Sequence, residues 1–290
     1  MIEKSDYMNN YFIDMHTHTT ASDGTLTPTE LIRLAKETGL KAVAVTDHDT
    51  VEGIEEALKE GEKVGIEVIP GIEFAAAYEG ETEIHILGFF IDYKNHKLNE
   101  TLKSIKEARD KRNILMVENL RKICMNITID DIINEAGGNI ITRAHFAAVL
   151  EKKGYVKSKN EAFKYFISPG KPGYVRREFI TPKMCIETIN NAGGVAFLAH
   201  PTLYKMSYKQ IEKLISELIE YGLKGIEGEY STYSEEQEKN IKKIANKFNI
   251  MISGGSDFHG NNKPDIKIGI GMGNLKIPYE YIENIKFSIL

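Results

Sequence analysis

The sequence predicts an α/β fold in which seven strands and their helices form a closed or nearly closed barrel, interrupted by one helical insertion. Three observations support this. Buried strand patterns alternate with amphipathic helical patterns in both parts of the chain, a long charged helical stretch interrupts them once, and ligand-type polar residues recur where strands end. The 290 residues suit one barrel-sized domain. We expect the barrel over 1–95 and 181–290 and a helical cap over 96–180.

The first part of the chain predicts four strands, each an apolar run, over 11–18, 42–48, 67–74 and 82–92. The first helix begins after Thr27, because Pro28 and Glu30 complete a helix-start pattern, and Gly39 ends it. A second helix is predicted over about 51–64, and a turn at Glu79-Gly80 precedes the fourth strand. These elements read as successive βα units.

The alternation breaks after the fourth strand. Residues 98–122 carry apolar and charged residues at helical spacing, shorter helical pieces follow, and the loop SPGKPGYV over 168–175 closes the stretch. The alternation then resumes, with helices predicted over 181–192, 207–221 and 234–248 and strands over 195–200, 225–230 and 251–259. Seven buried strands separated by helices predict parallel strands, which is the usual arrangement in a barrel.

Composition excludes several classes of protein. With 42% hydrophobic and 27% charged residues, the chain is neither collagen-like, disordered nor membrane-spanning. The first ten residues show no secretory signal pattern, so we expect a cytoplasmic protein. The only cysteines, Cys124 and Cys185, lie far apart and outside any CxxC motif, which argues against a disulfide scaffold and a cysteine-bound zinc site.

Charge is unevenly distributed along the chain. The net charge is −5, yet residues 94–183 contain 19 Lys or Arg against 10 Asp or Glu. An acidic body with a basic middle segment suggests cations held in one part and an anionic substrate gathered by the other. A solvated basic helical face explains the same numbers, and charge alone favours that simpler interpretation.

Ligand-type residues follow most predicted strands. Because the carboxyl ends of parallel strands share one face of a barrel, these side chains can converge there. His16 and His18 end the first strand at a spacing that puts both imidazoles on one side. The other residues of this kind are Asp47, His48, Asp49, Glu73, His85, His200, Asp257 and His259.

Each of these residues also has a simpler explanation. Asp23, taken singly, favours a turn-capping role beside Gly24, and His48 is equally compatible with a solvated loop. His85 and His200 are each typical of core histidines with satisfied hydrogen bonds. Taken together, however, histidines at so many strand ends with acids between them indicate a site for several metal ions. Imidazole and carboxylate ligands without thiolates suit Zn²⁺, Mn²⁺ or Fe²⁺.

Six motifs then carry a resemblance to a known family. HTHTTASDGTLTP, TDHDT, PGIEF, EIHILGF, LAHP and GGSDFHG occur in this order, and together they resemble the PHP (polymerase and histidinol phosphatase) family of metal-dependent phosphoesterases. TRAHFA and GKPGYV in the insertion resemble the branch of 3′,5′-nucleoside bisphosphate phosphatases and 5′-3′ exoribonucleases. The resemblance implies a distorted (β/α)₇ TIM-like barrel with two or three divalent ions.

The resemblance also implies which residues bind the ions. The implied sites are His16, His18, Glu73 and Asp257, then Asp23, His48 and His259, and finally Glu73, His85 and His200. Some relatives have histidine where Asp23 stands. We take Asp257 and His200 as candidate catalytic residues, and the general acid stays open between Asp257 and a metal-bound water.

Substrate recognition is expected from the basic insertion. Planar guanidinium groups bind phosphate in a bidentate manner, so Arg143, Arg176 and Arg177 are candidates, followed by Lys171. His145, beside Arg143, is a further candidate phosphate contact or else a helix-surface histidine. Tyr174 and Phe179 flank the arginine pair, and each suits either stacking on a base or core packing.

The expected activity is hydrolysis of the phosphate of nucleoside 3′,5′-bisphosphates, or of nucleotides at the 5′ end of short RNA, by metal-activated hydroxide. The expected partner is a small phosphorylated substrate, with no membrane and no obligate protein partner. One alternative is a histidinol phosphate phosphatase, which would need an acidic group for the substrate amine. The other is a non-catalytic module that binds nucleic acid or accompanies a polymerase; a complete ligand set argues against it.

Overall fold

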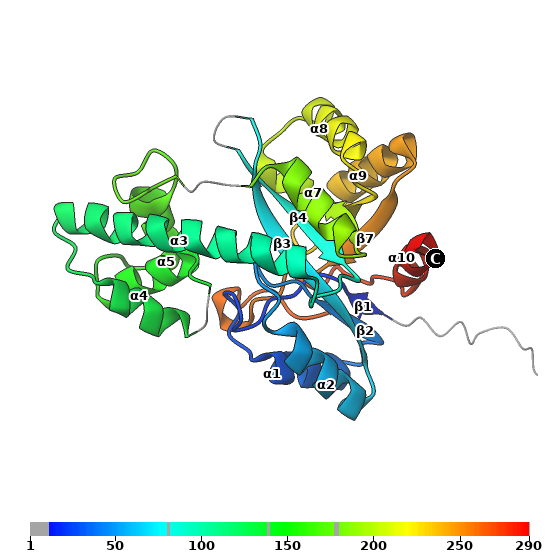
Figure 1. Ribbon diagram of the computed structural model, residues 1–290, viewed down its shortest axis with the longest axis horizontal. Coiled ribbons are helices and arrows are strands. Elements are labelled where there is room, and N and C mark those ends of the chain that lie inside the picture. Colours follow the sequence, from blue (N-terminus) through cyan, green and yellow to red (C-terminus); the bar gives the residue numbers. More distant parts are fainter. Residues whose placement is uncertain (1–11, 80–81, 138–139, 177–179, 290) are drawn as a thin grey trace, which may run out of the picture.

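A seven-stranded sheet, in the order β1 to β7, forms the centre of the protein (Figure 1). The computed structural model describes residues 12–79, 82–137, 140–176 and 180–289. The strands are β1 (Ile13–Asp14), β2 (Ala42–Val45), β3 (Glu67–Ala77), β4 (Glu83–Phe89), β5 (Val195–Leu198), β6 (Gly225–Tyr230) and β7 (Met251–Gly255). The chain after β1 lies against the end of β7, where Met15 N–H donates to the Gly254 carbonyl at 3.2 Å. The sheet is therefore nearly closed.

The direction of one strand contradicts the predicted all-parallel arrangement. β4 pairs antiparallel with both β3 and β5, whereas the other pairs are parallel. Only residues 78–82 separate β3 from β4, which allows a hairpin but is too short for the crossover that a parallel pair requires. Because β4 is reversed, its amino end lies at the edge where the neighbouring strands have their carboxyl ends. His85 therefore reaches this edge although it stands early in its strand.

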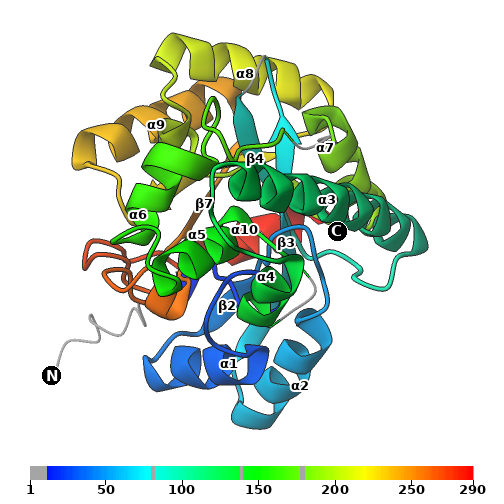
Figure 2. The same cartoon turned by 90° about the vertical axis from the view of Figure 1, so that its left-hand side faces the viewer.

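The helices surround this sheet. They are α1 (Pro28–Glu37), α2 (Ile54–Val64), α3 (His96–Lys122), α4 (Ile129–Ala136), α5 (Arg143–Lys152), α6 (Lys159–Ala162), α7 (Pro182–Asn191), α8 (Tyr208–Glu220), α9 (Glu235–Phe248) and α10 (Glu280–Ile289). The predicted helix at 27–39 is confirmed together with its cap, since Thr27 and Glu30 form a capping box. α10 lies outside the predicted elements. In Figure 2, α3 to α6 lie in front of the sheet.

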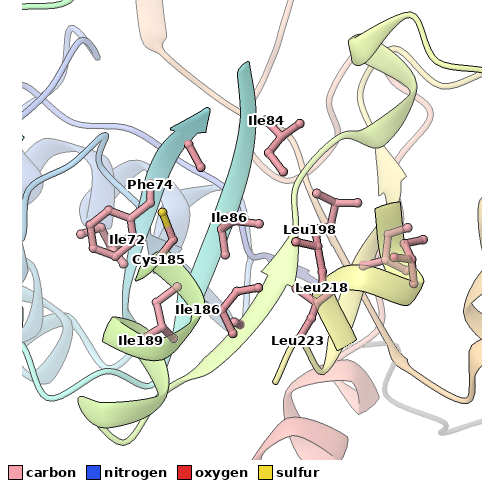
Figure 3. Close-up of a cluster of buried hydrophobic side chains, with 14 of the residues drawn as sticks. Ile72, Phe74, Ile84, Ile86, Cys185, Ile186, Ile189, Leu198, Leu218 and Leu223 are labelled. Carbon is pink, nitrogen blue, oxygen red and sulfur yellow. The ribbon is translucent and has the colours of Figure 1, made fainter. Parts of the chain in front are cut away.

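Alternation along β3 and β4 separates the hydrophobic core from the polar edge. Successive strand residues face opposite sides of a sheet. Ile72, Phe74, Ile84 and Ile86 pack outward against Ile186 and Ile189 of α7, in the cluster drawn in Figure 3. The residues between them face the barrel interior, where the rings of Phe89 and Phe197 lie 5.2 Å apart. Glu73 and His85 belong to this interior set.

The insertion has a hydrophobic cluster of its own. Met116 and Leu120, in the second half of α3, pack there with Phe146 and Leu150 of α5. Leu98, in the first half of α3, belongs to the main core instead. The long helix α3 thus joins the insertion to the barrel. No helix within the described ranges has both the length and the apolar character needed to cross a membrane.

Candidate metal centre

Glu73 is the centre of a buried cluster of imidazoles. Its Oε2 lies 3.2 Å from Nε2 of His16, 3.3 Å from Nε2 of His18 and 3.0 Å from Nδ1 of His48. Its Oε1 lies 2.8 Å from Nδ1 of His85 and 3.0 Å from Nε2 of His200. One carboxylate on β3 thus meets histidines that follow β1, β2 and β5 or stand in β4. The predicted convergence at one edge of the sheet is present.

Two further carboxylates complete the cluster. Oδ1 of Asp257 lies 3.2 Å from Nε2 of His18 and 3.3 Å from Nδ1 of His259. Oδ1 of Asp23 lies 3.3 Å from Nε2 of His259 and 3.9 Å from Nε2 of His48. The carboxylate of Asp23 therefore belongs to the cluster. All nine residues predicted as metal ligands lie in this cluster.

Local backbone features position these side chains. Three residues of this region, Asp49, His200 and Asp257, have φ values of 51°, 23° and 57°, a strained region for any residue except glycine. A Cβ at Gly255 would lie 2.2 Å from Cβ of His16, so only glycine lets the end of β7 approach the first strand this closely. The surrounding fold therefore holds the ligand loops in unfavourable conformations.

The carboxylates beside His48 contact neighbouring loops and helix α3. Asp47 accepts hydrogen bonds from N–H of Thr19 at 2.7 Å and from Oγ of Ser22 at 2.6 Å, which fixes the loop after His18. Asp49 accepts from Ala75 N–H at 3.2 Å and pairs with Arg109 of α3. The structure thus assigns both acids to loop positioning.

Charge coupling shifts the titration of the metal-free cluster. Burial alone would raise the pKa of Glu73, but the nearby imidazoles outweigh burial and hold that pKa well below its usual value. Burial also lowers the pKa of His18 and His85, yet the adjacent carboxylates raise these pKa values to about 9 and about 10. Burial dominates at His48 and lowers its pKa to about 3. Without cations, the cluster therefore retains protons on some of its imidazoles.

The donor set fits divalent cations. Buried polar atoms are normally hydrogen-bonded. Several atoms here have no hydrogen-bond partner within the described part of the chain, namely Nε2 of His16, both ring nitrogens of His18, Oδ1 of Asp23, Nδ1 of His48, Oε2 of Glu73 and Nδ1 of His200. Four overlapping groups of these residues have potential ligand atoms within 4.8 Å of one another. Divalent cations satisfy such converging lone pairs.

A cavity of about 390 Å³ opens beside this cluster. Asp23, His48, His85 and His259 of the cluster line it. The cationic residues that line it are Arg109, Arg112, Arg143, Lys159 and Lys263. The ring of Tyr174 lies 5.8 Å from the guanidinium carbon of Arg143, and both side chains line the cavity. The lining of the cavity therefore combines potential metal ligands with cationic side chains.

The predicted substrate-binding residues lie in different positions relative to the cavity. Arg143 lines the cavity, with Nη2 3.5 Å from Oε1 of Glu83. His145 is buried and caps α5 by accepting N–H of Thr142 at Nδ1, at 3.1 Å, so it is no helix-surface histidine. Lys171 and Arg176 are exposed and do not belong to the described residues that line the cavity. Arg177 and Phe179 lie outside the described residues.

Five residues of the site were not predicted from the sequence. Arg109 and Arg112 lie three positions apart on α3, and that spacing could have placed both on one helix face. Glu227 is fully buried in β6, and an acid inside a predicted buried strand calls for a partner. Lys159 and Lys263 carried no comparable signal.

Comparison with known proteins identifies the family. The sequence profile of the PHP domain matches residues 14–169. The chain belongs to the PHP family. A 5′-3′ exoribonuclease from Haemophilus influenzae is 38% identical over 246 residues, which cover 85% of this chain and 89% of the relative. A 3′,5′-nucleoside bisphosphate phosphatase from Chromobacterium violaceum is 34% identical and covers 89% of this chain and 90% of its own length.

Two solved PHP-like structures share the fold. One is described as a metal-dependent phosphoesterase from Bifidobacterium adolescentis, with 30% identity, a TM-score of 0.84 and 95% of each chain covered. The other is described as an amidohydrolase from Chromobacterium violaceum with bound sulfate, with 34% identity, a TM-score of 0.83 and 89% of each chain covered. Sulfate has the shape and charge of a phosphate group. The resemblance drawn from the sequence motifs is thus confirmed at the level of the family.

Proposed function

We propose that this PHP protein is a metal-dependent phosphoesterase acting on nucleoside 3′,5′-bisphosphates or on nucleotides at the 5′ end of short RNA. One observation carries the proposal: a single cavity is lined both by residues of the imidazole and carboxylate cluster and by five cationic side chains. This arrangement suits a substrate with a reacting phosphate and a second anionic group. The names of the two curated relatives above support the same substrate classes.

The cluster is proposed to hold two or three ions of Mn²⁺, Fe²⁺ or Zn²⁺. The proposed ligand sets are His16, His18, Glu73 and Asp257, then Asp23, His48 and His259, and finally Glu73, His85 and His200, with Glu73 shared. Ions bound here would supply Lewis-acid activation of the phosphate ester and of the attacking water. The protein contributes the rigid loops that hold these donors and the cavity that admits the ester.

Asp257 and His200 are the proposed catalytic residues. Oδ2 of Asp257 accepts hydrogen bonds from the Tyr230 hydroxyl and from Nζ of Lys263, each at 2.6 Å, which leaves Oδ1 directed at the cluster. His200 directs Nε2 at Oε1 of Glu73, at 3.0 Å. The two side chains are thus each held with one polar atom directed at the cluster.

The cationic residues that line the cavity are proposed to bind the substrate's second anionic group, which does not react. Arg143 offers bidentate contacts to a phosphate, and Tyr174 offers a face on which a base can stack. Lys171, Arg176, Arg177 and His145 stay proposals for substrate contacts, with His145 acting through the position of α5. We further propose that the barrel is a distorted (β/α)₇ TIM-like barrel over 1–95 and 181–290, with 96–180 as its cap.

A histidinol phosphate phosphatase is the second candidate, and one observation favours it. Glu83 lines the cavity and is the kind of acidic group that a substrate amine would require. Its Oε1 lies 3.2 Å from Nε2 of His85 and 3.5 Å from Nη2 of Arg143, so cations of the protein already surround it. The five cationic residues that line the same cavity repel an amine, so a substrate with a second anionic group is the more favourable ligand.

The test is phosphate release by the Mn²⁺-loaded protein from three substrates: 3′-phosphoadenosine 5′-phosphate, a short 5′-phosphorylated RNA and histidinol phosphate. We expect activity on the nucleotide or the RNA and little on histidinol phosphate. His16→Ala should abolish this activity, because it removes a donor from the centre of the cluster. Preferential release from histidinol phosphate would contradict the proposed substrate.

His96→Ala is the matched control. The His96 side chain is 88% exposed at the start of α3 and lies outside the cluster. We expect this variant to keep wild-type activity and metal content. Equal loss of activity in both histidine variants would contradict the assignment of the cluster as the active site.

A further inference from the structure

Glu227 contacts two histidines of the imidazole and carboxylate cluster. It stands in β6 and is fully buried. Its Oε1 lies 2.9 Å from Nδ1 of His16, and its Oε2 accepts the backbone N–H of His200 at 2.8 Å. His16 follows β1 and His200 follows β5, so a third strand connects two donors that are distant in the sequence.

The first contact selects the tautomer of His16. An ionised carboxylate only accepts hydrogen bonds, so Nδ1 of His16 carries the proton in this pair. Nε2 is then the nitrogen that is left to bind a cation, and it faces Oε2 of Glu73 at 3.2 Å and Oδ1 of Asp257 at 3.6 Å. A metal-binding histidine typically donates its other ring N–H to a carboxylate or carbonyl in this way.

The second contact holds the backbone of His200. This residue has φ 23° and ψ 55°, which a non-glycine residue adopts only when its surroundings impose it. The hydrogen bond from its N–H to Glu227 anchors this turn at the end of β5. In the resulting orientation, Nε2 of His200 lies 3.0 Å from Oε1 of Glu73, and its ring stacks 5.7 Å from that of His16.

We propose that Glu227 is a positioning residue that keeps His16 and His200 in their metal-binding orientations. The inference rests on the proposed function, in which both histidines are metal ligands. A buried carboxylate is costly unless it is hydrogen-bonded, and the two contacts to ligand residues supply that compensation. Glu227 would act through these histidines without itself touching substrate.

Glu229 provides a matched control on the same strand. It is also buried, but its Oε1 accepts from Nζ of Lys242 at 2.7 Å and from the hydroxyl of Tyr281 at 2.6 Å. Glu229→Gln removes the same charge from β6 without changing a contact of the cluster. It therefore reports the general cost of losing a buried carboxylate from this strand.

The experiment compares Mn²⁺ binding by wild type, Glu227→Gln and Glu229→Gln, using metal-free proteins and titration calorimetry. In Glu227→Gln an amide N–H₂ must replace one acceptor, so either Nδ1–H of His16 or the N–H of His200 loses its partner. We expect the Mn²⁺ affinity of this variant to fall about 10- to 100-fold. Glu229→Gln should keep the wild-type affinity.

Each outcome has a distinct meaning. Wild-type affinity in Glu227→Gln would contradict the positioning role while leaving the proposed function intact. A wild-type protein that binds no Mn²⁺ would contradict the proposed function and, with it, the ligand roles on which this inference rests. An equal loss of affinity in both variants would also contradict the inference, because the effect would then belong to the strand.

A second measurement avoids the variant altogether, in case Glu227→Gln does not fold. Long-range ¹H–¹⁵N spectra of the zinc-loaded wild type report which ring nitrogen of each histidine carries the proton, with the His16 signals assigned by their loss in His16→Ala. We expect the His16 proton on Nδ1. A proton on Nε2 would contradict the proposal.

Discussion

At the scale of single residues, Glu73 shows why the site tolerates few substitutions. One buried carboxylate lies within 3.3 Å of five imidazoles that come from four separate stretches of chain. Gln at this position would replace one of the two acceptor oxygens with a donor, and Asp is shorter by one methylene group. The sequence could indicate Glu73 as a ligand, because an acid inside an apolar strand requires a partner. It could not indicate how many partners meet there.

Arg143 and Arg176 give a prediction at this scale. Arg143→Ala should raise KM for 3′-phosphoadenosine 5′-phosphate by roughly tenfold or more, because a hydrogen bond to a charged group contributes about 1.5–3 kcal/mol. It should lower kcat less, since binding of the non-reacting group is lost in ground and transition states alike. Arg176→Ala should raise KM less, because Arg176 is exposed and outside the cavity lining. Steady-state kinetics of both variants test this ranking, and a larger effect at Arg176 would contradict it.

At the scale of elements, α3 joins the insertion to the metal loops through a buried ion pair. Nε of Arg109 donates to Oδ2 of Asp49 at 3.0 Å, and Nη2 of Arg109 contacts the same oxygen. Nη1 of Arg109 lies 3.4 Å from the carbonyl of Ile141, next to the start of α5. This one side chain therefore connects the loop of His48 with the helix that carries Arg143.

Breaking this pair should destabilise the protein strongly. Arg109→Met leaves Asp49 charged and buried, which costs about 3–5 kcal/mol of unfolding free energy. Lys106→Met is the control on the same helix: Lys106 and Asp110 are 41% and 46% exposed, and such surface pairs contribute about 0–1 kcal/mol. Urea unfolding of the metal-free proteins measures both effects. Equal stability of the two variants would show that the buried pair contributes no more than a surface pair.

The direction of β4 shows which property of a strand the sequence pattern does not report. The apolar pattern of residues 82–92 correctly predicted a strand, since an apolar pattern indicates which residues of a segment are buried. Orientation depends on the connection, and the five residues after β3 permit only a hairpin. The sequence predicts a turn at Glu79-Gly80, of which Gly80 lies outside the described residues, so the reversal could have been inferred. Its consequence for His85 could not, because that depends on which edge of the sheet carries the site.

At the scale of the whole molecule, the metal-free cluster links stability to pH. The pKa of His18 rises from 6.5 to about 9 in the folded protein, and that of His85 rises from 6.5 to about 10. A raised imidazole pKa stabilises the folded state fully below pH 6.5 and loses this contribution as the pH rises through the folded value. The carboxylate charges of the cluster are then left uncompensated.

The metal-free protein should therefore lose stability between pH 6.5 and about 10. Excess Mn²⁺ should suppress this loss, because cations replace the protons and bind more tightly as the imidazoles deprotonate. Urea unfolding with chelator and with Mn²⁺ at several pH values in this window measures both curves. A metal-free curve that is flat, or that rises with pH, would contradict the proton-sharing cluster.

The sequence by itself determined most of the elements, the family and the nine proposed ligands, because strand and helix patterns are local and the family motifs that contain the ligands are continuous in the sequence. Only the tertiary structure decided which residues meet: Glu227 beneath His16 and His200, Arg109 on Asp49, Lys263 on Asp257, and His145 as a helix cap. Glu227 and Arg109 contact residues far away in the chain, whereas Lys263 and His145 contact residues six and three positions away. Their distances depend on how the sheet closes and how the insertion packs, and periodicity in one segment carries no information about either.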